Sequence, residues 1–189
     1  MDVRTLTLFG LLTTALLGAP ALAQESTSNA AGGNSVSAPK PPPELEKLKA
    51  ESDTGRGSTC EGHHSEMPGC PAGPTHSTFS SWKAELGGFW YVAHEEGSTC
   101  GPYKVLEIQG YDHGKKKFVN YRFYDFGAYQ LSTSDNADGP WTGTFVMNGK
   151  ETPARATLTV KNDHESIMTI ENQVDGQWKK TGESVCRKQ

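Results

Sequence analysis

The C-terminal part of the chain, residues 140–185, constrains the fold most, because it combines short strands with tight turns. Between 154 and 161, apolar residues at even positions alternate with polar or charged residues at odd positions, which is typical of a half-buried strand. Asn148-Gly149 and Asp175-Gly176 separate consecutive segments of this kind, and both dipeptides favour type I′ turns, whose central residues need positive φ. The pattern predicts a chain of hairpins, and hairpins joined end to end make an antiparallel meander or barrel.

The same type of segment recurs along most of the chain. Aromatic and β-branched runs bounded by Gly, Asp, Asn and Pro return about every ten to twelve residues, the spacing of an all-β sandwich or barrel. Ten strands of this kind are enough to close a barrel, and closure removes unpaired strand edges. We predict strands near 56–62, 75–86, 89–96, 103–111, 117–124, 127–134, 141–147, 152–161, 165–174 and 177–186.

The N-terminal residues 1–23 predict a cleavable secretory signal peptide. One Arg precedes an apolar run from Leu6 to Leu17, and Ala21-Leu22-Ala23 forms a small-residue cleavage site. A membrane anchor is the alternative, but the run is too short for a hydrocarbon core of roughly 30 Å. We therefore expect a secreted or periplasmic protein without stable membrane insertion.

Residues 24–43 predict a flexible linker, and residues 44–189 predict a single β-barrel domain. The linker is rich in Ser, Asn, Ala, Gly and Pro, so no burial offsets the entropy of ordering it. After Pro41-Pro42-Pro43, the segment 44–51 places Leu45 and Leu48 three residues apart, which indicates a short amphipathic helix. Fewer than three turns are marginal alone, so we expect this helix to pack across one mouth of the barrel.

Several short motifs resemble the secreted bacterial proteins grouped as domain of unknown function 1579. The matching pieces are Pro43-Glu44-Leu45, Cys60-Glu61-Gly62, Leu86-Gly87-Gly88-Phe89-Trp90, Gly110-Tyr111-Asp112 and Val185-Cys186-Arg187-Lys188. The resemblance implies an antiparallel meander that closes into a roughly ten-stranded calycin-like β-barrel, and it carries no activity with it. Residues 51–59 depart from the family pattern, because they lack the apolar residues of its usual first strand. Residues 134–140 read as a loop.

The four cysteines, Cys60, Cys70, Cys100 and Cys186, are even in number and follow a secretory signal, which favours disulfides. Three pairings are open to four cysteines. Barrel closure places the first and last strands side by side, which favours Cys60 with Cys186 and leaves Cys70 with Cys100. The first bridge would compensate for a weak first strand.

The segment from Cys60 to Cys70 gathers thiol, imidazole, carboxylate and thioether groups, which are ligand types for copper or zinc. However, His63 and His64 are adjacent and would point to opposite faces of a strand, and oxidised cysteines cannot act as ligands. We predict a polar surface loop here and no metal or other cofactor. A basic run at 115–117 is most simply a charged strand end in a chain of net charge −4, so no nucleic-acid partner is predicted.

Large aromatic residues occur on both faces of the predicted strands, more than one core needs, so some should line a cavity. We therefore predict a binding protein for a small apolar or amphipathic molecule. The alternatives are a hydrolase or lyase acting on a small cell-envelope metabolite through His94 and a carboxylate, and a structural or protein-interaction module. No nucleophile elbow or phosphate loop is present, and a pocket shared by His94 and Arg122 would favour the enzyme. The candidate lining residues are Trp82, Trp90, Tyr91, His94, Tyr121, Arg122, Phe123, Tyr129 and Trp141.

Overall fold

The computed structural model describes residues 39–67 and 69–189; the predicted signal peptide and most of the predicted linker lie outside these ranges. The described elements are the 3₁₀ turn η1 (Pro43–Leu45), the helix α1 (Glu46–Thr54), the strands β1 (Ser58–His64), β2 (Gly73–Phe79) and β3 (Lys83–Glu85), the 3₁₀ turn η2 (Leu86–Gly88), and the strands β4 (Trp90–Ser98), β5 (Pro102–Asp112), β6 (Lys117–Tyr124), β7 (Tyr129–Ser134), β8 (Trp141–Met147), β9 (Lys150–Val160), β10 (Glu165–Val174) and β11 (Gln177–Lys188).

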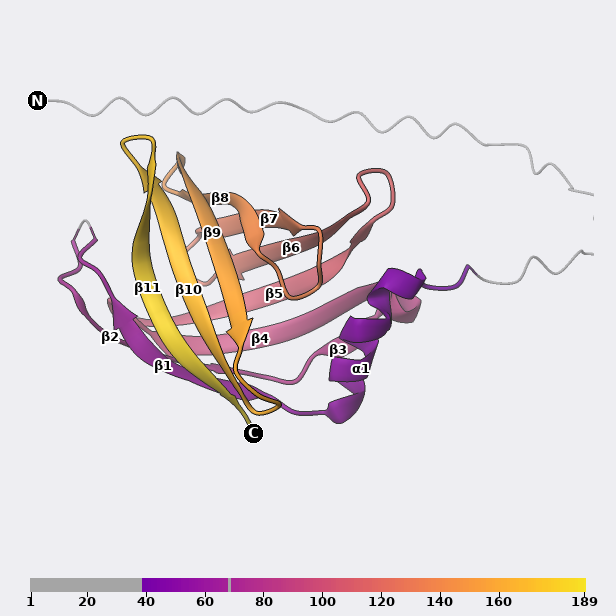
Figure 1. The fold of residues 1–189 in the computed structure, drawn as a ribbon. Coiled ribbons are helices and arrows are strands. Elements are labelled where there is room, and N and C mark those ends of the chain that lie inside the picture. Colours follow the sequence, from indigo (N-terminus) through magenta and orange to yellow (C-terminus); the bar gives the residue numbers. More distant parts are fainter. Residues whose placement is uncertain (1–38, 68) are drawn as a thin grey trace, which may run out of the picture. The chain divides into compact units, whose positions relative to one another are not determined.

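The strands form a closed antiparallel barrel with a short N-terminal helix, which confirms the predicted fold class (Figure 1). Strands β4 to β11 follow one another as a meander, β11 pairs with β1, and β1 pairs with β2. The pairing of β2 with β4 closes the ring of ten strands, and β3 is an extra strand on β4. Closure leaves the ten barrel strands with partners on both sides.

The strand predicted over 75–86 is divided in two. β2 pairs with β4 as far as Phe79, and β3 begins only at Lys83. Between them, the backbone N–H of His94 donates to the Ser80 hydroxyl at 2.9 Å, so a side chain takes the place of a ladder partner. The Ser80 N–H still donates to the His94 carbonyl oxygen at 2.8 Å, so β2 ends where only one of the two backbone ladder bonds is made.

The two dipeptide turns confirm the hairpin prediction. Asn148 and Gly149 have φ values of 51° and 74°, and Asp175 and Gly176 have 53° and 75°. Positive φ at both central residues is what a type I′ turn requires. These turns connect β8 to β9 and β10 to β11.

The N-terminal helix is longer than predicted, since η1 and α1 together run from Pro43 to Thr54, and it ends at Gly55 in the left-handed region. Its two leucines, Leu45 and Leu48, are each 2% exposed and pack in one cluster with Tyr91 and Phe118. Trp82, Tyr111, Ala137 and Trp141 pack against this cluster. The cluster draws on β4, β5, β6 and β8, so α1 lies across one end of the barrel, as expected (Figure 1).

Candidate functional site

Strand β4 shows which side chains face the barrel interior. Tyr91, Ala93 and Glu95 are 2%, 1% and 3% exposed, whereas His94 is classed among the exposed residues. Alternation along a strand therefore directs the odd-numbered residues of β4 inward. The candidate lining residues Trp90 and His94 therefore face outward, because the register places the other set of side chains in the core.

Cross-strand pairing extends this assignment around the barrel. Ala93 pairs with Glu107, and Glu107 pairs with Arg122, so all three face inward. Among the predicted lining residues, Tyr91, Arg122 and Trp141 face the interior and Trp82 packs beside the α1 cluster, while Trp90, His94, Tyr121, Phe123 and Tyr129 lie on the outer face. Ligand contact by any of these residues stays a prediction.

Several of the large aromatic residues lie on the outer face. The Trp90 and Tyr121 rings lie 6.1 Å apart between centroids, and a Cβ at Gly110 would come within 2.5 Å of the Trp90 ring. Gly110 thus leaves the space in which Trp90 covers the outer surface of β5. Phe123, Tyr129 and Leu131 continue this outer apolar face and are 46%, 45% and 43% exposed.

Because His94 lies outside and Arg122 inside, the two side chains do not share a pocket. Glu95 and Glu107 also face inward, away from His94, whereas Glu96 lies on the same outer face as His94. The pocket shared by His94 and Arg122, which would favour the enzyme, is therefore not formed.

A charged cluster occupies the interior along β4, β5 and β6. The Arg122 guanidinium donates to one oxygen of Glu95, while the Tyr103 hydroxyl donates to the other at 2.8 Å. Glu107 lies on the other side of Arg122, with 3.8 Å between the arginine Nε and the glutamate Oε2. The side chains of Arg122, Glu95 and Glu107 are only 17%, 3% and 9% exposed, so water screens this group little.

Two amides complete the cluster around Glu107. Asn120 Nδ2 donates to Glu107 Oε1, and Gln109 Nε2 approaches the same oxygen at 3.4 Å. Asn120 is 4% exposed, and its Oδ1 is buried without a hydrogen-bond partner among the described residues. Arg122 Nε is likewise buried without a hydrogen bond. The interior therefore holds polar atoms whose bonding capacity the described chain does not use.

The protonation preferences of the neighbouring groups follow from burial and charge. Burial lowers the pKa of Arg122, but attraction by Glu95, Tyr124 and Glu107 outweighs it, so the net pKa is raised and the guanidinium stays charged. Burial, and then the negative charge of Glu95, raises the pKa of the Tyr103 hydroxyl. The pKa of Tyr124 is also raised, mainly by burial. Both tyrosines therefore remain hydrogen-bond donors at neutral pH.

Across the barrel, β8, β9 and β10 present an apolar inner wall. Leu158 pairs with Met168, and Ala156 pairs with both Trp141 and Ile170, so these side chains face the interior with Phe145. Leu158 is nevertheless 37% exposed, and Phe145, Met168 and Ile170 are partly exposed. Apolar side chains that face inward thus remain partly accessible on this side of the barrel.

The Cys60 to Cys70 segment is divided between the two faces. His64 is 7% exposed and its ring lies 3.8 Å from the Cys70 sulfur, while His63 lines an outer groove. His64, Cys70 and Cys100 lie close enough to share a metal ion. However, Cys70 is bonded to Cys100, and a disulfide does not supply thiolate ligands.

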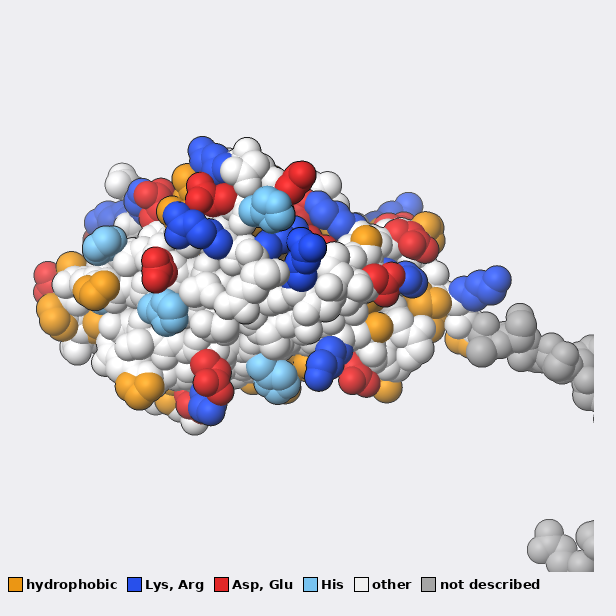
Figure 2. All heavy atoms as spheres, turned by 90° about the horizontal axis from the view of Figure 1, so that it is seen from below, with side chains coloured by type: hydrophobic (Ala, Val, Ile, Leu, Met, Phe, Trp, Pro, Cys, Tyr) orange, Lys and Arg blue, Asp and Glu red, His pale blue; other side chains and the backbone are white. Residues whose placement is uncertain are grey.

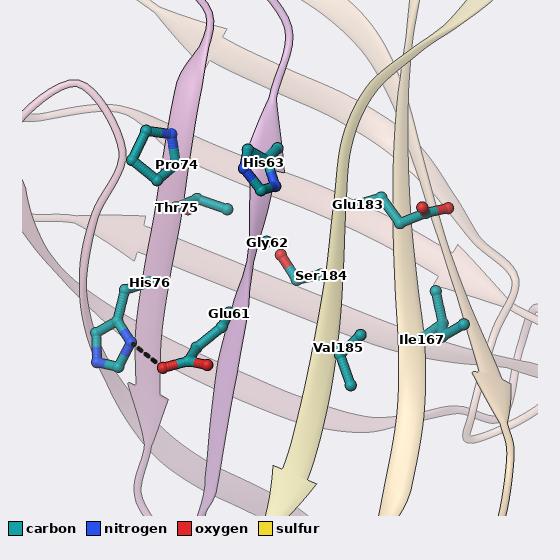
Figure 3. A pocket seen from close by; sticks show the side chains of 10 residues that line it. All are labelled: Glu61, Gly62, His63, Pro74, Thr75, His76, Ile167, Glu183, Ser184 and Val185. Carbon is teal, nitrogen blue, oxygen red and sulfur yellow. Dashed lines mark ion pairs between the residues drawn. The ribbon is translucent and has the colours of Figure 1, made fainter.

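The surface of the described residues has at least two hollows. The first, of about 530 Å³, runs over the outer face of β1, β2, β10 and β11, where Glu61 and His76 form a 4.0 Å ion pair (Figure 3). The second, of about 440 Å³, lies beside α1 at the Lys47 and Asp138 pair. Acidic and basic side chains are interspersed on the face shown in Figure 2. The first hollow is lined by Glu61, Gly62, His63, Pro74, Thr75, His76, Ile167, Glu183, Ser184 and Val185.

The sequence interpretation missed the main members of the interior cluster: Glu95, Glu107, Gln109, Asn120 and Tyr103. Their signal is an alternation running from Tyr103 to Gln109 on β5, in which every second residue is polar or aromatic except Val105. The outer positions between them include Leu106 and Ile108, which resemble core residues in the sequence. Both faces of these strands look half-buried from sequence alone.

Comparison with known proteins gives no family: no family model matches the chain, and no curated protein matches it. The resemblance to domain of unknown function 1579 therefore stays a prediction. Among the described residues, none of the helices has the length and apolar character to cross a membrane.

Proposed function

We propose that the barrel is a binding protein that holds a small amphipathic molecule in its interior, outside the cytoplasm. The observation that carries this proposal is the asymmetry of the inner wall. A buried charged cluster around Arg122 lies on β4 to β6, and accessible apolar side chains such as Ile170 lie on β8 to β10. Such a lining suits a ligand with one polar end and one apolar body.

Location and fold type support the proposal indirectly. The two disulfides fit an oxidising compartment, and a ten-stranded barrel is wide enough to hold one small ligand. The predicted signal peptide and the calycin-like resemblance point the same way. With His94 outside, binding is favoured over catalysis.

A substitution that fills the barrel interior with a larger side chain tests whether the interior is the binding site. An uncharged environment-sensitive dye should give a saturable fluorescence signal with the wild-type protein. Ile170→Trp should weaken dye binding about tenfold or more, because the larger side chain fills the interior beside Met168. A tenfold weaker affinity corresponds to a loss of about 1.4 kcal/mol of binding free energy. Thr169→Trp is the matched control, since Thr169 neighbours Ile170 and faces outward.

Circular dichroism should show that both variants are folded, because overpacking can cost about 1–3 kcal/mol. The absence of any saturable signal with folded wild-type protein would overturn the proposal. An equal loss in both variants would place the dye outside the barrel.

A further inference from the structure

We infer that the ligand of the interior site carries a protonated amine at its polar end; the inference rests on the proposed function. The first argument is charge. The buried cluster contains two carboxylates, Glu95 and Glu107, and one guanidinium, Arg122, so its formal charge is −1. A cationic head group would neutralise this charge, whereas a carboxylate would double it.

The second argument is hydrogen bonding. Asn120 donates through Nδ2 to Glu107, which fixes the orientation of its amide and directs Oδ1 away from that carboxylate. Asn120 lies on the inner face, and its Oδ1 is buried without a hydrogen-bond donor among the described residues. An unsatisfied buried acceptor costs about 1–3 kcal/mol, so a donor at this position would be stabilising.

The cluster also contains an unpaired donor, Arg122 Nε, but this atom does not remove the need for a donor to Asn120 Oδ1. Arg122 Nε lacks a hydrogen bond, but Glu107 Oε2 is 3.8 Å away, so a small rotation supplies its acceptor. Asn120 Oδ1 makes no hydrogen bond to any described residue. The cluster is therefore short of one donor and one positive charge, and an ammonium group provides both.

The rim of the barrel carries positive charge, opposite in sign to the interior cluster. Lys150 pairs with Met147, and Lys179 pairs with Asn172, so both lysines lie on the inner side at the end away from α1 and are exposed. Exposed charges are screened by salt within about 8–10 Å. We therefore expect the buried cluster, and not these lysines, to select the head group.

Three ligands with the same twelve-carbon chain test the inference: dodecylammonium, dodecan-1-ol and dodecanoate. Each is titrated into the wild-type barrel at neutral pH, the two ions below their micelle concentrations and the alcohol below its solubility limit, with displacement of the dye as the readout. We expect the ammonium to bind at least about tenfold more tightly than the alcohol, and the carboxylate to bind weakest. This series needs no variant, so it does not depend on a mutant that folds.

Two charge-matched variants locate the effect. Glu107→Gln removes a carboxylate next to the unpaired acceptor, and it should abolish the preference for ammonium over alcohol. Glu96→Gln changes the net charge equally, but Glu96 faces outward and pairs with Lys104, so the preference should persist. A non-specific attraction to an acidic protein would fall equally in both variants.

The outcomes separate the two proposals. Equal affinity for alcohol and ammonium would overturn the inference and indicate that an ordered water satisfies Asn120. Tighter binding of dodecanoate would overturn it in favour of the rim lysines, while the proposed function would stand. If none of the three ligands displaced the dye or bound at all, the proposed function itself would fail.

Discussion

Two adjacent carboxylates on β4 experience different surroundings. Glu95 accepts hydrogen bonds from Tyr103 and Arg122 inside the barrel, whereas Glu96 pairs with Lys104 in solvent. The first interaction lies in a medium of low dielectric constant, where an unpaired charge is costly. The second is an exposed pair, of the kind that contributes about 0–1 kcal/mol.

This difference predicts the response to losing Arg122. Arg122→Met should lower the free energy of unfolding by about 3–5 kcal/mol, because Glu95 and Glu107 would be left buried without a counter-charge. Arg155→Met is the control: Arg155 pairs with Glu171 on the outer face, is 36% exposed, and should cost about 1 kcal/mol or less. Urea denaturation measures both.

A second substitution distinguishes charge from packing. If the cost comes from unpaired charge, Arg122→Met with Glu95→Gln should recover part of the lost stability. Equal losses in Arg122→Met and Arg155→Met would contradict the buried-charge interpretation.

At the scale of single residues, the sequence could predict only part of the site. Tyr91, Arg122 and Trp141 face the interior, but their neighbours Trp90 and Tyr121 were proposed as lining residues too, and the direction of β4 depends on its register against β5, which a one-residue shift reverses. Both faces of β4 to β6 carry large apolar residues, so hydrophobic pattern could not decide between them. The contacts of Glu107 with Asn120 and Arg122 join β5 to β6 and have no local sequence signal.

At the scale of the elements, prediction was more successful. The Asn-Gly and Asp-Gly turns and the strand runs around them are local features, so β8 to β11 were predicted within a few residues of their bounds. The break between β2 and β3 was missed, because it depends on Ser80 meeting His94 of another strand. The helix continues beyond the predicted end at residue 51 through Ser52 to Thr54. These three residues are not apolar, but they precede Gly55, which ends the helix.

The helix α1 should contribute to stability through its two buried leucines. Leu48→Ala should lower the free energy of unfolding by about 2–5 kcal/mol, because Leu48 is 2% exposed and packs with Tyr91 and Phe118. Ala50→Ser, on the exposed side of the same helix, should stay within about 0.5 kcal/mol of wild type. Thermal and urea unfolding give the comparison. If both variants matched wild type, α1 would not be docked on the barrel.

At the scale of the whole molecule, closure depends on its least apolar strand. β1 contains no large aliphatic or aromatic residue, and it lies between β11 and β2. Backbone pairing on both sides and the bond from Cys60 to Cys186 hold it in place, and both predicted disulfides are confirmed. The bridge joins directly paired residues, so it fixes the register at which the first strand meets the last.

The two disulfides should therefore differ in their effect on stability. Cys60 and Cys186 are separated by 126 positions, and Cys70 and Cys100 by 30. The loop-entropy argument gives about 5 kcal/mol for the first bridge and about 3.5 kcal/mol for the second. Replacing Cys60 and Cys186 by Ala should thus lower the urea midpoint more than replacing Cys70 and Cys100 by Ala.

Because a loss of about 5 kcal/mol approaches the total stability of many domains, both double variants should be compared in sucrose, which favours the folded state. Hydrogen exchange then tests the structural cause. Without the Cys60 bridge, amides of β1 should exchange faster than those of β5 or β6, because β1 lacks apolar anchors that hold it independently. Removing the Cys70 bridge should leave β1 protected. An equal or smaller loss for the Cys60 and Cys186 variant, with β1 still protected, would mean that backbone pairing alone closes the barrel.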